Sequence, residues 1–259
     1  MTPSRTSQEQ FDRQAAHYNA QWNAWSGDSL VWLVARARCL PSSSVLDVAT
    51  GAGFTAVAFA PLAAEVIGLD VSTGMLREAR ERARAAVAAN VTFETGAAES
   101  LPFPAARFDI LVCRLAAHHF LSVPAFAAEA FRVLRPGGRL LISDTAEPDG
   151  APAVDAWHNR LEVLRDPSHV RNYTPAEWRA FATGAGFVVD ELETVCESLC
   201  GTMHSWIEKG GCGEDAAAEI RRLILTAPPE SARAFCFTQL PDGDVSFKWV
   251  RVALSAHKP

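Results

Sequence analysis

The chain has 259 residues, of which 49% are hydrophobic and 21% are charged, so it holds enough apolar material for one large core with a smaller lid. Its 24 Lys and Arg residues against 30 Asp and Glu residues give a formal net charge of -6, which argues against binding to nucleic acid or to an anionic membrane. No run approaches the roughly 18 apolar residues of a membrane span and the N-terminus has no signal-peptide core, so we expect a cytosolic protein that acts on a small molecule.

Residues 1–40 are expected to form a helical lid segment, followed by a core over residues 41–146. In this core, five short apolar runs alternate with helical segments, which predicts a Rossmann-like, doubly wound α/β sheet that is mostly parallel. Alternating Arg and Glu in residues 73–90 predict an exposed helix that ends at Asn90, and Pro and Gly in residues 135–138 predict a turn. The five expected strands cover residues 44–50, 64–72, 91–96, 108–117 and 139–146.

Residues 147–259 are expected to supply helical lid insertions and the last strands of the sheet. Thr174, Pro175 and Glu177 have the pattern of an N-cap, a first helical residue and a capping box, which predicts a helix that begins there. Alternating apolar and polar residues predict an antiparallel C-terminal strand pair at the far end of the sheet. The expected helices cover residues 148–166, 174–187 and, in pieces broken at Gly210 and Gly211, 203–235; the expected strands cover 188–195 and 245–258.

The stretch SSSVLDVATGAGFTAVAFA holds Gly51, Gly53 and Ala56 in the G-x-G-x-x-A spacing of a nucleotide-binding turn. A pyrophosphate would suit the N–H groups of such a turn, but Asp47 lies four residues before Gly51, and its charge would repel a diphosphate and attract an ammonium group. Asp70 ends the second expected strand, where a carboxylate can accept both hydroxyls of a ribose. A diol at one end and an amino acid at the other describe S-adenosylmethionine.

Five motifs in the correct order resemble those of the class I S-adenosylmethionine-dependent methyltransferases over roughly residues 11 to 145. The first two motifs are VLDVATGAGFTA and VIGLDVSTGMLREAR. The third and fourth lie together in FETGAAESLPFPAARFDILVCRLAAHHF, and the fifth is AEAFRVLRPGGRLLISD. More narrowly, AAHHF together with RDPSHVRNYTPAEW is similar to the quinone-biosynthesis (ubiquinone and menaquinone) branch. The resemblance implies methyl transfer from S-adenosylmethionine to a small organic, aromatic or quinone-like acceptor, at carbon or oxygen.

The resemblance also assigns cofactor-binding roles at matching positions. The glycine turn with Asp47 would hold the methionine part, Asp70 the ribose, and Met75 one face of the adenine. Relatives commonly carry Asp where this chain has Ala97, so one side-chain contact to the adenine is missing, while the backbone N–H of Ala98 is still available. The residues expected to bind the cofactor are Tyr18, Asp47, Ala49, Gly51, Gly53, Asp70, Val71, Met75, Ala97, Ala98, Glu99 and Arg114.

Tyr18 lies in a segment that resembles the first helix and lid of this branch, where a tyrosine approaches the cofactor carboxylate. An equal alternative is that Tyr18 is an amphipathic core contact at helical spacing, as Trp22 and Trp25 are expected to be unless they form a wall of the acceptor pocket. Other aromatic residues that would favour an aromatic or prenylated acceptor are Phe120, Phe126, Trp157 and Trp178.

His118 and His119 follow the fourth expected strand at the edge where ligands bind in open α/β sheets. A histidine there is suited to take a proton from a phenol, enol or thiol, and we favour His119 because it lies nearer the following turn. The alternative is that the pair packs beneath the next helix or caps it. His169 and Arg171 are expected to bind the acceptor from a loop between lid helices, with a solvated loop or pairing with Asp166 as the alternative.

All six cysteines are expected to be thiols in a reducing cytosol, and Cys196, Cys200 and Cys212 are expected to be buried small side chains and not metal ligands. Cys196, Cys200 and Cys212 invite a zinc interpretation, but no second close ligand pair accompanies them. The sequence leaves the oligomeric state open, a homodimer included. Two further functions also stay open: a non-catalytic regulatory protein that binds S-adenosylmethionine, and a nicotinamide oxidoreductase, which Asp47 and the missing hydride-transfer site disfavour.

Overall fold

A computed structural model describes residues 6–21, 27–196 and 201–259. Its main sheet has seven strands in the order β3-β2-β1-β4-β5-β10-β6, and β10 runs antiparallel to both of its neighbours. The predicted fold, a mostly parallel Rossmann-like sheet with an antiparallel C-terminal strand, is therefore confirmed. The strands are β1 (Ser44–Val48), β2 (Glu65–Asp70), β3 (Val91–Thr95), β4 (Phe108–Arg114), β5 (Leu134–Thr145), β6 (Val188–Cys196) and β10 (Val250–His257).

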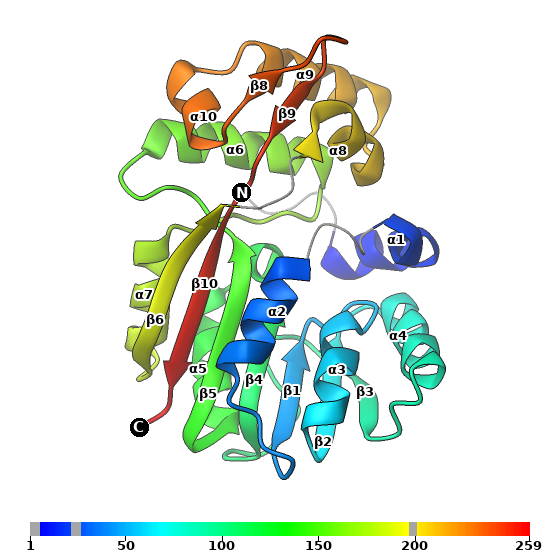
Figure 1. The fold of residues 1–259 in the computed structure, drawn as a ribbon, viewed down its shortest axis with the longest axis vertical. Helices are drawn as coiled ribbons and strands as arrows, with labels where there is room; N and C mark the ends of the chain where they lie inside the picture. The colour runs from blue at the N-terminus through cyan, green and yellow to red at the C-terminus, as the bar shows by residue number, and fades with distance from the viewer. Residues whose placement is uncertain (1–5, 22–26, 197–200) are drawn as a thin grey trace.

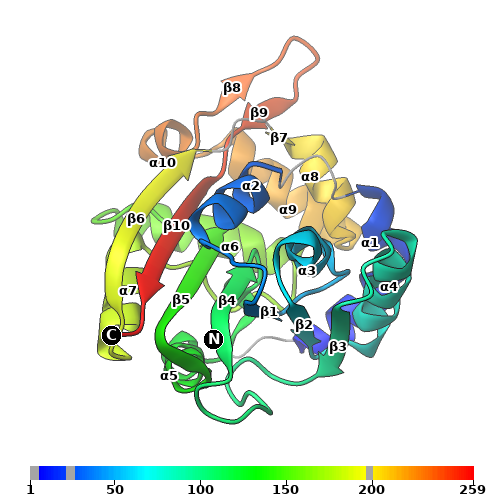
Figure 2. The same cartoon turned by 60° about the horizontal axis from the view of Figure 1, so that its bottom comes forward.

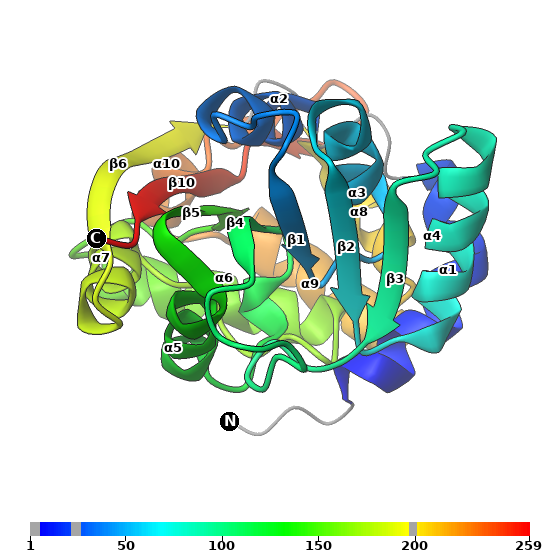
Figure 3. The ribbon, with the colours of Figure 1, turned by 90° about the horizontal axis from the view of Figure 1, so that it is seen from below.

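Helices cover both faces of this sheet (Figure 3). The strands are apolar on both faces because each face is covered: β1, for example, is buried along its whole length. One face carries α2 (Gly27–Arg36) and α3 (Phe54–Phe59), the other α5 (Val123–Val133) and α7 (Pro175–Gly184), and α4 (Thr73–Ala85) lies beside the edge strand β3. Two short 3₁₀ turns, η1 (Ala60–Leu62) and η2 (Ala117–His119), follow α3 and β4.

A lid stands above the carboxyl ends of the parallel strands (Figure 1). It has its own core, in which Trp206, Phe235, Phe247 and Trp249 are buried against one another. Its second sheet has the order β7-β9-β8, and the β8–β9 ribbon extends away from the main sheet (Figure 2). The lid elements are α6 (Pro152–Arg165), β7 (Gly201–Thr202), α8 (Met203–Gly210), α9 (Glu214–Leu225), α10 (Pro229–Ala234), β8 (Thr238–Gln239) and β9 (Val245–Phe247).

The helix α1 (Ser7–Gln21) packs beside α4, at the level between the sheet and the lid (Figure 1). Asp12 joins them: its Oδ1 accepts hydrogen bonds from Ser72 Oγ at 2.6 Å and from the N–H of Gly74 at 2.9 Å. Ser72 is itself the N-cap of α4 and accepts from the N–H of Met75. A carboxylate at a helix N-terminus is stabilised by the unpaired N–H groups there, so Asp12 fixes α1 on the end of α4.

Two elements after residue 147 are placed differently from the expectation. The helix α7, predicted from its capping box, begins as expected, with Thr174 and Glu177 bonded reciprocally. Its buried Trp178 and Ala182, however, pack in the same core as the sheet and not in the lid. The strand predicted over residues 245–258 is divided, because β9 pairs within the lid sheet while β10 pairs with β5 and β6.

Two predicted boundaries are wrong. The helix α4 ends at Ala85 and not at Asn90, because Val87 has a left-handed φ of 54° and the Asn90 side chain donates to the carbonyl groups of Ala60 and Ala63. The strand β5 begins at Leu134 and not at residue 139, because the expected turn at residues 135–138 is a bulge within it: Leu134 pairs with Phe108, Arg139 pairs with Ile110, and Gly137 between them has a left-handed φ of 77°.

Candidate active site

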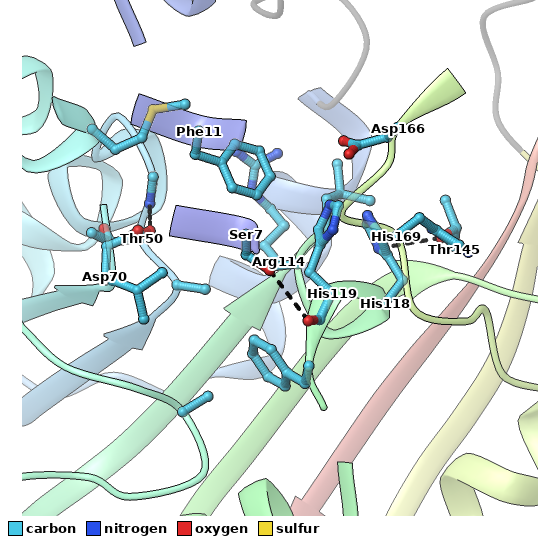
Figure 4. A pocket seen from close by; sticks show the side chains of 18 of the residues that line it. Ser7, Phe11, Thr50, Asp70, Arg114, His118, His119, Thr145, Asp166 and His169 are labelled. Atoms are coloured by element: carbon cyan, nitrogen blue, oxygen red, sulfur yellow. Dashed lines mark hydrogen bonds between the residues drawn. The ribbon is translucent and has the colours of Figure 1, made fainter. Parts of the chain in front are cut away.

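The carboxyl ends of the parallel strands, α1 and the lid enclose a cavity of about 530 Å³. A volume of this size is typical of small-molecule and cofactor sites. Figure 4 shows its two sides: Asp70 and Thr50 lie on the side of the glycine turn, and His118, His119, His169 and Asp166 gather on the other. The cavity therefore has one half built by the sheet and one half built where the sheet meets the lid.

The glycine turn follows β1 and is held in left-handed backbone conformations. Ala49 has a φ of 55°, Gly51 of 52° and Gly53 of 81°. A Cβ on Gly53 would lie 2.9 Å from Cβ of Ala79, so this glycine lets the turn approach α4. A Cβ on Gly51 would meet no atom within 4 Å, and both Ala49 and Gly51 line the cavity. The turn thus presents open backbone to a ligand.

Asp70 ends β2 beside this turn and lines the cavity. Its Oδ2 accepts from the N–H of Gly51 at 2.8 Å, and its Oδ1 accepts from the N–H of Ser72 at 2.9 Å. Burial raises the pKa of Asp70, and these backbone donors oppose the shift. Each carboxylate oxygen keeps a second lone pair, so Asp70 can still accept from a pair of ligand hydroxyls.

Asp47 is placed differently from the expectation. It is buried beneath the turn and is not among the described residues that line the cavity. Its Oδ2 accepts from Thr50 Oγ1 at 2.6 Å, and Thr50 does line the cavity. Burial raises the pKa of Asp47 to about 7, although Thr50 and Arg114 oppose the shift. Asp47 therefore acts on the cavity through Thr50 in this structure.

The far end of this half is apolar and suits a flat ring. Met75 is fully buried yet lines the cavity, packed with Ala15 and Ala52. The other cavity-lining residues expected to bind the cofactor at this end are Val71, Ala97, Ala98 and Glu99. Glu99 also accepts from the N–H of Leu121 at 2.8 Å, so its carboxylate is held against the loop after η2.

Arg114 and Tyr18 complete the expected cofactor residues. Arg114 lines the cavity from the end of β4, and its Nε donates to Thr55 Oγ1 at 2.9 Å. Tyr18 falls within α1, but its side chain lies outside the part of the chain that the structure describes, as do Trp22 and Trp25. The described part of α1 closes the cavity with Ser7 and Phe11, which the sequence did not single out.

His118 is held as a histidine–carboxylate pair. The ring Nδ1 of His118 lies 2.6 Å from Oδ1 of Asp144, and the backbone N–H of His118 donates to Oδ2 of Asp144 at 3.0 Å. Burial lowers the pKa of His118, but the charge and hydrogen bond of Asp144 outweigh this and raise the pKa above its ordinary value. The ring lines the cavity, and no described residue is bonded to its Nε2. This nitrogen is available to a ligand.

His119 and His169 have the opposite electrostatics. The Nδ1 of His119 lies 3.2 Å from the carbonyl oxygen of Ser168, and burial together with His118 lowers the pKa of His119 to about 4. The Nε2 of His169 lies 3.1 Å from Oδ1 of Asn159, and burial holds its pKa well below the ordinary value. Both line the cavity. The distance between ring centroids is 4.2 Å for His118 and His119 and 5.4 Å for His118 and His169, so the three rings are clustered.

Arg171 is not among the described residues that line the cavity. It is paired with Asp155 at 3.1 Å and with Glu177 at 2.9 Å. The expected pairing partner, Asp166, instead accepts from the N–H and the hydroxyl of Ser168 and lines the cavity itself. The structure therefore gives no support to a contact between Arg171 and the acceptor, since its guanidinium is neutralised by two carboxylates outside the cavity.

The lid half contains residues that sequence reasoning missed. Three of them are aromatic, and Trp206 is far along the chain from Phe247 and Trp249, so no local pattern announces the group. Glu162 and Arg165 lie at the end of the helix expected over residues 148–166, where the acids Glu162 and Asp166, four residues apart, share a helix face. Lys209 belongs to α8. The missed lining residues of the lid are Glu162, Arg165, Trp206, Lys209, Phe247 and Trp249.

The aromatic candidates and the cysteines are mostly elsewhere. Phe120 lines the cavity, whereas Phe126 and Trp178 are in the sheet core and Trp157 is in the lid core. Among the described residues, no group of three or more His, Cys, Asp or Glu is arranged to hold a metal ion. Cys212 is half-buried against the lid core; Cys200 and the side chain of Cys196 lie outside the described residues.

No helix in the described part of the chain has the length and apolar character needed to cross a membrane.

Comparison with known proteins bears on the chemistry of the cavity. A family model for a methyltransferase domain matches residues 46–142. This span runs from the glycine turn to β5 and includes Asp70, His118 and His119.

Full-length relatives extend this match. The chain is 36% identical over 243 residues to the "uncharacterized methyltransferase YcgJ" of Bacillus subtilis (strain 168), and the match covers 93% of this chain and 95% of that protein. The crystal structure of YcgJ has a TM-score of 0.84 at 37% identity, covering 89% of this chain and 98% of that chain. A demethylmenaquinone methyltransferase of Symbiobacterium thermophilum is 35% identical over 152 residues, which cover 54% of this chain and 59% of that protein.

Proposed function

From the premise that this chain belongs to the class I S-adenosylmethionine-dependent methyltransferases, we propose that it methylates a small hydroxylated acceptor, aromatic or quinone-like, at carbon or oxygen. The enzyme class and the cofactor follow from the family. The acceptor class, the residue roles and the cytosolic location are parts of the proposal. The cytosolic location is supported by the cysteines, since a reducing compartment keeps cysteines as free thiols. Among the described side chains, the free cysteines are Cys39, Cys113, Cys212 and Cys236.

The sheet half of the cavity fits S-adenosylmethionine in shape and in chemistry. Asp70 offers acceptor lone pairs for the ribose hydroxyls, Gly51 leaves open space over the turn, and Met75 offers a polarizable surface to the adenine. When bound, the cofactor supplies a methyl group on a sulfonium, which is already a good leaving group. The protein must then align the acceptor, exclude water and, for an acidic acceptor, remove a proton.

The hydrogen-bonded pair of His118 and Asp144 carries the proposal. Asp144 fixes the ring through Nδ1 and leaves Nε2 without a partner among the described residues, on a side chain that lines the cavity, as a general base requires. His118 suits this role better than His119, which the sequence favoured, because the lowered pKa of His119 makes it a weak base and its Nδ1 is taken up by Ser168. A phenol or an enol brought against Nε2 of His118 would lose its proton there and gain the methyl group at oxygen or at the activated carbon.

Two observations support an aromatic acceptor. Phe120, Trp206 and Trp249 line the cavity, and such side chains bind flat apolar rings. In addition, a relative with 35% identity over part of the chain is named for demethylmenaquinone methylation.

The test is turnover of S-adenosylmethionine with phenols, dihydroxybenzenes and reduced naphthoquinones, followed as S-adenosylhomocysteine. We expect one of these classes to be methylated and His118→Gln to lower turnover about 10²- to 10⁴-fold, the usual contribution of a positioned base, with S-adenosylhomocysteine affinity unchanged. Asp70→Ala should instead weaken S-adenosylhomocysteine binding, measured by calorimetry. Binding of S-adenosylhomocysteine without turnover on any of these acceptors would contradict the proposed acceptor class and would favour a regulatory role.

A further inference from the structure

Glu162 is a carboxylate that the described contacts of the protein do not fully use. It lies on the last turn of α6, it is only 7% exposed, and what it is exposed to is the cavity that it lines. Its two ion-pair contacts are long: Oε1 is 3.4 Å from Nε2 of His158, and Oε2 is 4.0 Å from Nη1 of Arg165. Among the described residues, none donates a hydrogen bond of ordinary length and angle to it.

A buried, positively charged histidine keeps Glu162 ionised. His158 is fully buried, and its Nδ1 lies 2.6 Å from Oε1 of Glu147. Burial opposes the charged ring, yet Glu147 and Glu162 raise the pKa of His158 to about 10. Burial likewise opposes the Glu162 carboxylate, but His158, with a smaller contribution from Arg165, lowers the pKa of Glu162 to about 2. At neutral pH His158 and Glu162 are therefore both charged.

This charge state excludes one role for Glu162 and favours another. A carboxylate that stays ionised down to strongly acidic pH is too weak a base to deprotonate a phenol, so the proton falls to His118. A buried carboxylate offers about four acceptor lone-pair sites, and leaving them without donors is costly. A donor supplied by a ligand in the cavity would satisfy them.

The surroundings indicate a neutral donor. Arg165 and Lys209 line the same part of the cavity, and the Arg165 guanidinium lies over the ring of Trp206 at 4.9 Å while its Nε donates to the Trp206 carbonyl. These two cations offset the carboxylates of Glu162 and Asp166, which line the same cavity, so the lining offers no net negative charge to an added ammonium group. A hydroxyl or an aromatic amine carries a donor without a charge, so it suits this environment.

Glu162 also lies within electrostatic reach of the histidine cluster. Its charge is among the causes that raise the pKa of His118, and it opposes the lowering of the pKa of His169. A small acceptor held against Nε2 of His118 thus lies in the field of Glu162, and both residues line the same cavity.

We propose that Glu162 is a specificity-determining residue of the acceptor site, which accepts a hydrogen bond from a second protic group, a hydroxyl or an aromatic amine, on the molecule whose first protic group faces His118. The inference rests on the proposed function and narrows it to acceptors with two donors. His158 is its positioning residue, since His158 holds the carboxylate charged and in place.

The experiment compares catechol, resorcinol, hydroquinone and phenol as probes. Each is titrated by calorimetry into the enzyme saturated with S-adenosylhomocysteine, so that binding is measured without chemistry. We expect at least one dihydroxybenzene to bind the wild type about tenfold or more tightly than phenol, because hydrogen bonds to charged groups are strong. Glu162→Gln should reduce this preference to within about twofold and leave S-adenosylhomocysteine affinity unchanged.

The matched control is Glu219→Gln, a lid glutamate on α9 that pairs with Arg160 and Arg222 and is not among the described residues that line the cavity. It should keep the wild-type preference. His158→Gln should lose the preference in the same way as Glu162→Gln, and Glu162→Gln should also shift the NMR titration of His118 to lower pH.

The outcomes separate the two proposals. If no dihydroxybenzene binds the wild type better than phenol, or if Glu162→Gln keeps the preference, Glu162 does not recognise the acceptor, whatever the turnover assay shows. If S-adenosylhomocysteine binds, the preference depends on Glu162 and yet no hydroxylated acceptor is methylated, the binding role stands and the proposed reaction fails.

Discussion

His118 and His119 are neighbours in sequence with opposite properties in the folded chain. Asp144 holds one ring and raises its pKa, while burial and the charge of His118 lower the pKa of the other to about 4. Their order along the chain carries no information on this difference, because Asp144 lies near the end of β5 and Ser168 follows α6. Only the environment of each ring distinguishes a base from a packed neighbour.

A prediction at this scale concerns Asp144→Asn. Loss of the carboxylate removes the charge and the hydrogen bond that raise the pKa of His118, so the rise of turnover with pH should move to lower pH. The rate at the high-pH plateau should also fall, because the ring loses its orientation and basicity. The measurement is the pH–rate profile of wild type, Asp144→Asn and His118→Gln. A profile of Asp144→Asn that superimposes on the wild type would show that His118 does not supply the titrating group.

At the scale of elements, the cavity is closed by a helix that reaches it from outside the sheet. α1 is held on the N-terminus of α4 by Asp12, and it brings Ser7 and Phe11 to the cavity. The hydroxyl of Ser7 donates to the carbonyl of His119 at 3.4 Å, and the ring of Phe11 packs edge-on against the His119 ring at 4.9 Å. Docking of α1 therefore couples the cofactor side of the cavity to the histidine cluster.

We predict that Asp12→Ala weakens S-adenosylhomocysteine binding about tenfold, which corresponds to ~1.4 kcal/mol. The carboxylate accepts two hydrogen bonds at the end of α4, and their loss frees α1 from its place over the cavity. Calorimetry gives the affinity. Arg13→Ala, at an exposed neighbouring position on the same helix, is the control and should bind as the wild type does. Equal affinities for Asp12→Ala and wild type would mean that α1 contributes nothing to the cofactor site.

At the scale of the whole molecule, the sheet and the lid are joined by buried charges as well as by chain connections. Glu147 follows β5, while His158 and Glu162 belong to α6 of the lid. The His158 ring also packs at 4.4 Å from both Phe235 and Trp249 of the lid core. The ion pairs therefore fix the lid above the carboxyl ends of the strands.

The stability of the molecule should depend on pH through His158. Its pKa is raised to about 10 in the folded chain, so its contribution to the free energy of unfolding is complete below about pH 6.5 and is lost as pH rises through 10. We expect His158→Gln to destabilise the protein by about 3 kcal/mol at pH 6, since the substitution leaves an unpaired buried carboxylate. The destabilisation should be smaller at pH 9, because part of the contribution of the charged His158 is already lost there. Urea unfolding at both pH values measures this, with exposed His204→Gln as control. A difference that does not change with pH would show that His158 is uncharged in the folded protein.

Much of the fold could be predicted because its signals are local. Apolar runs that end in Gly or Asp indicated β1 and β2, and Thr174, Pro175 and Glu177 indicated the beginning of α7. The break at Gly210 and Gly211 between α8 and α9 was predicted for the same reason. No local signal indicated whether α7 covers the sheet or joins the lid, because both environments bury an amphipathic helix face equally well.

The sequence by itself determined the sheet half of the site, since Gly51, Gly53 and Asp70 lie within 20 residues of one another in a turn whose geometry is written in its spacing. The tertiary structure alone decided the lid half of the cavity. There the charge of Glu162 depends on His158 and Glu147, and the basicity of His118 depends on Asp144, which comes from another strand. Burial and the distance between charges set these properties, and neither exists until the chain has folded.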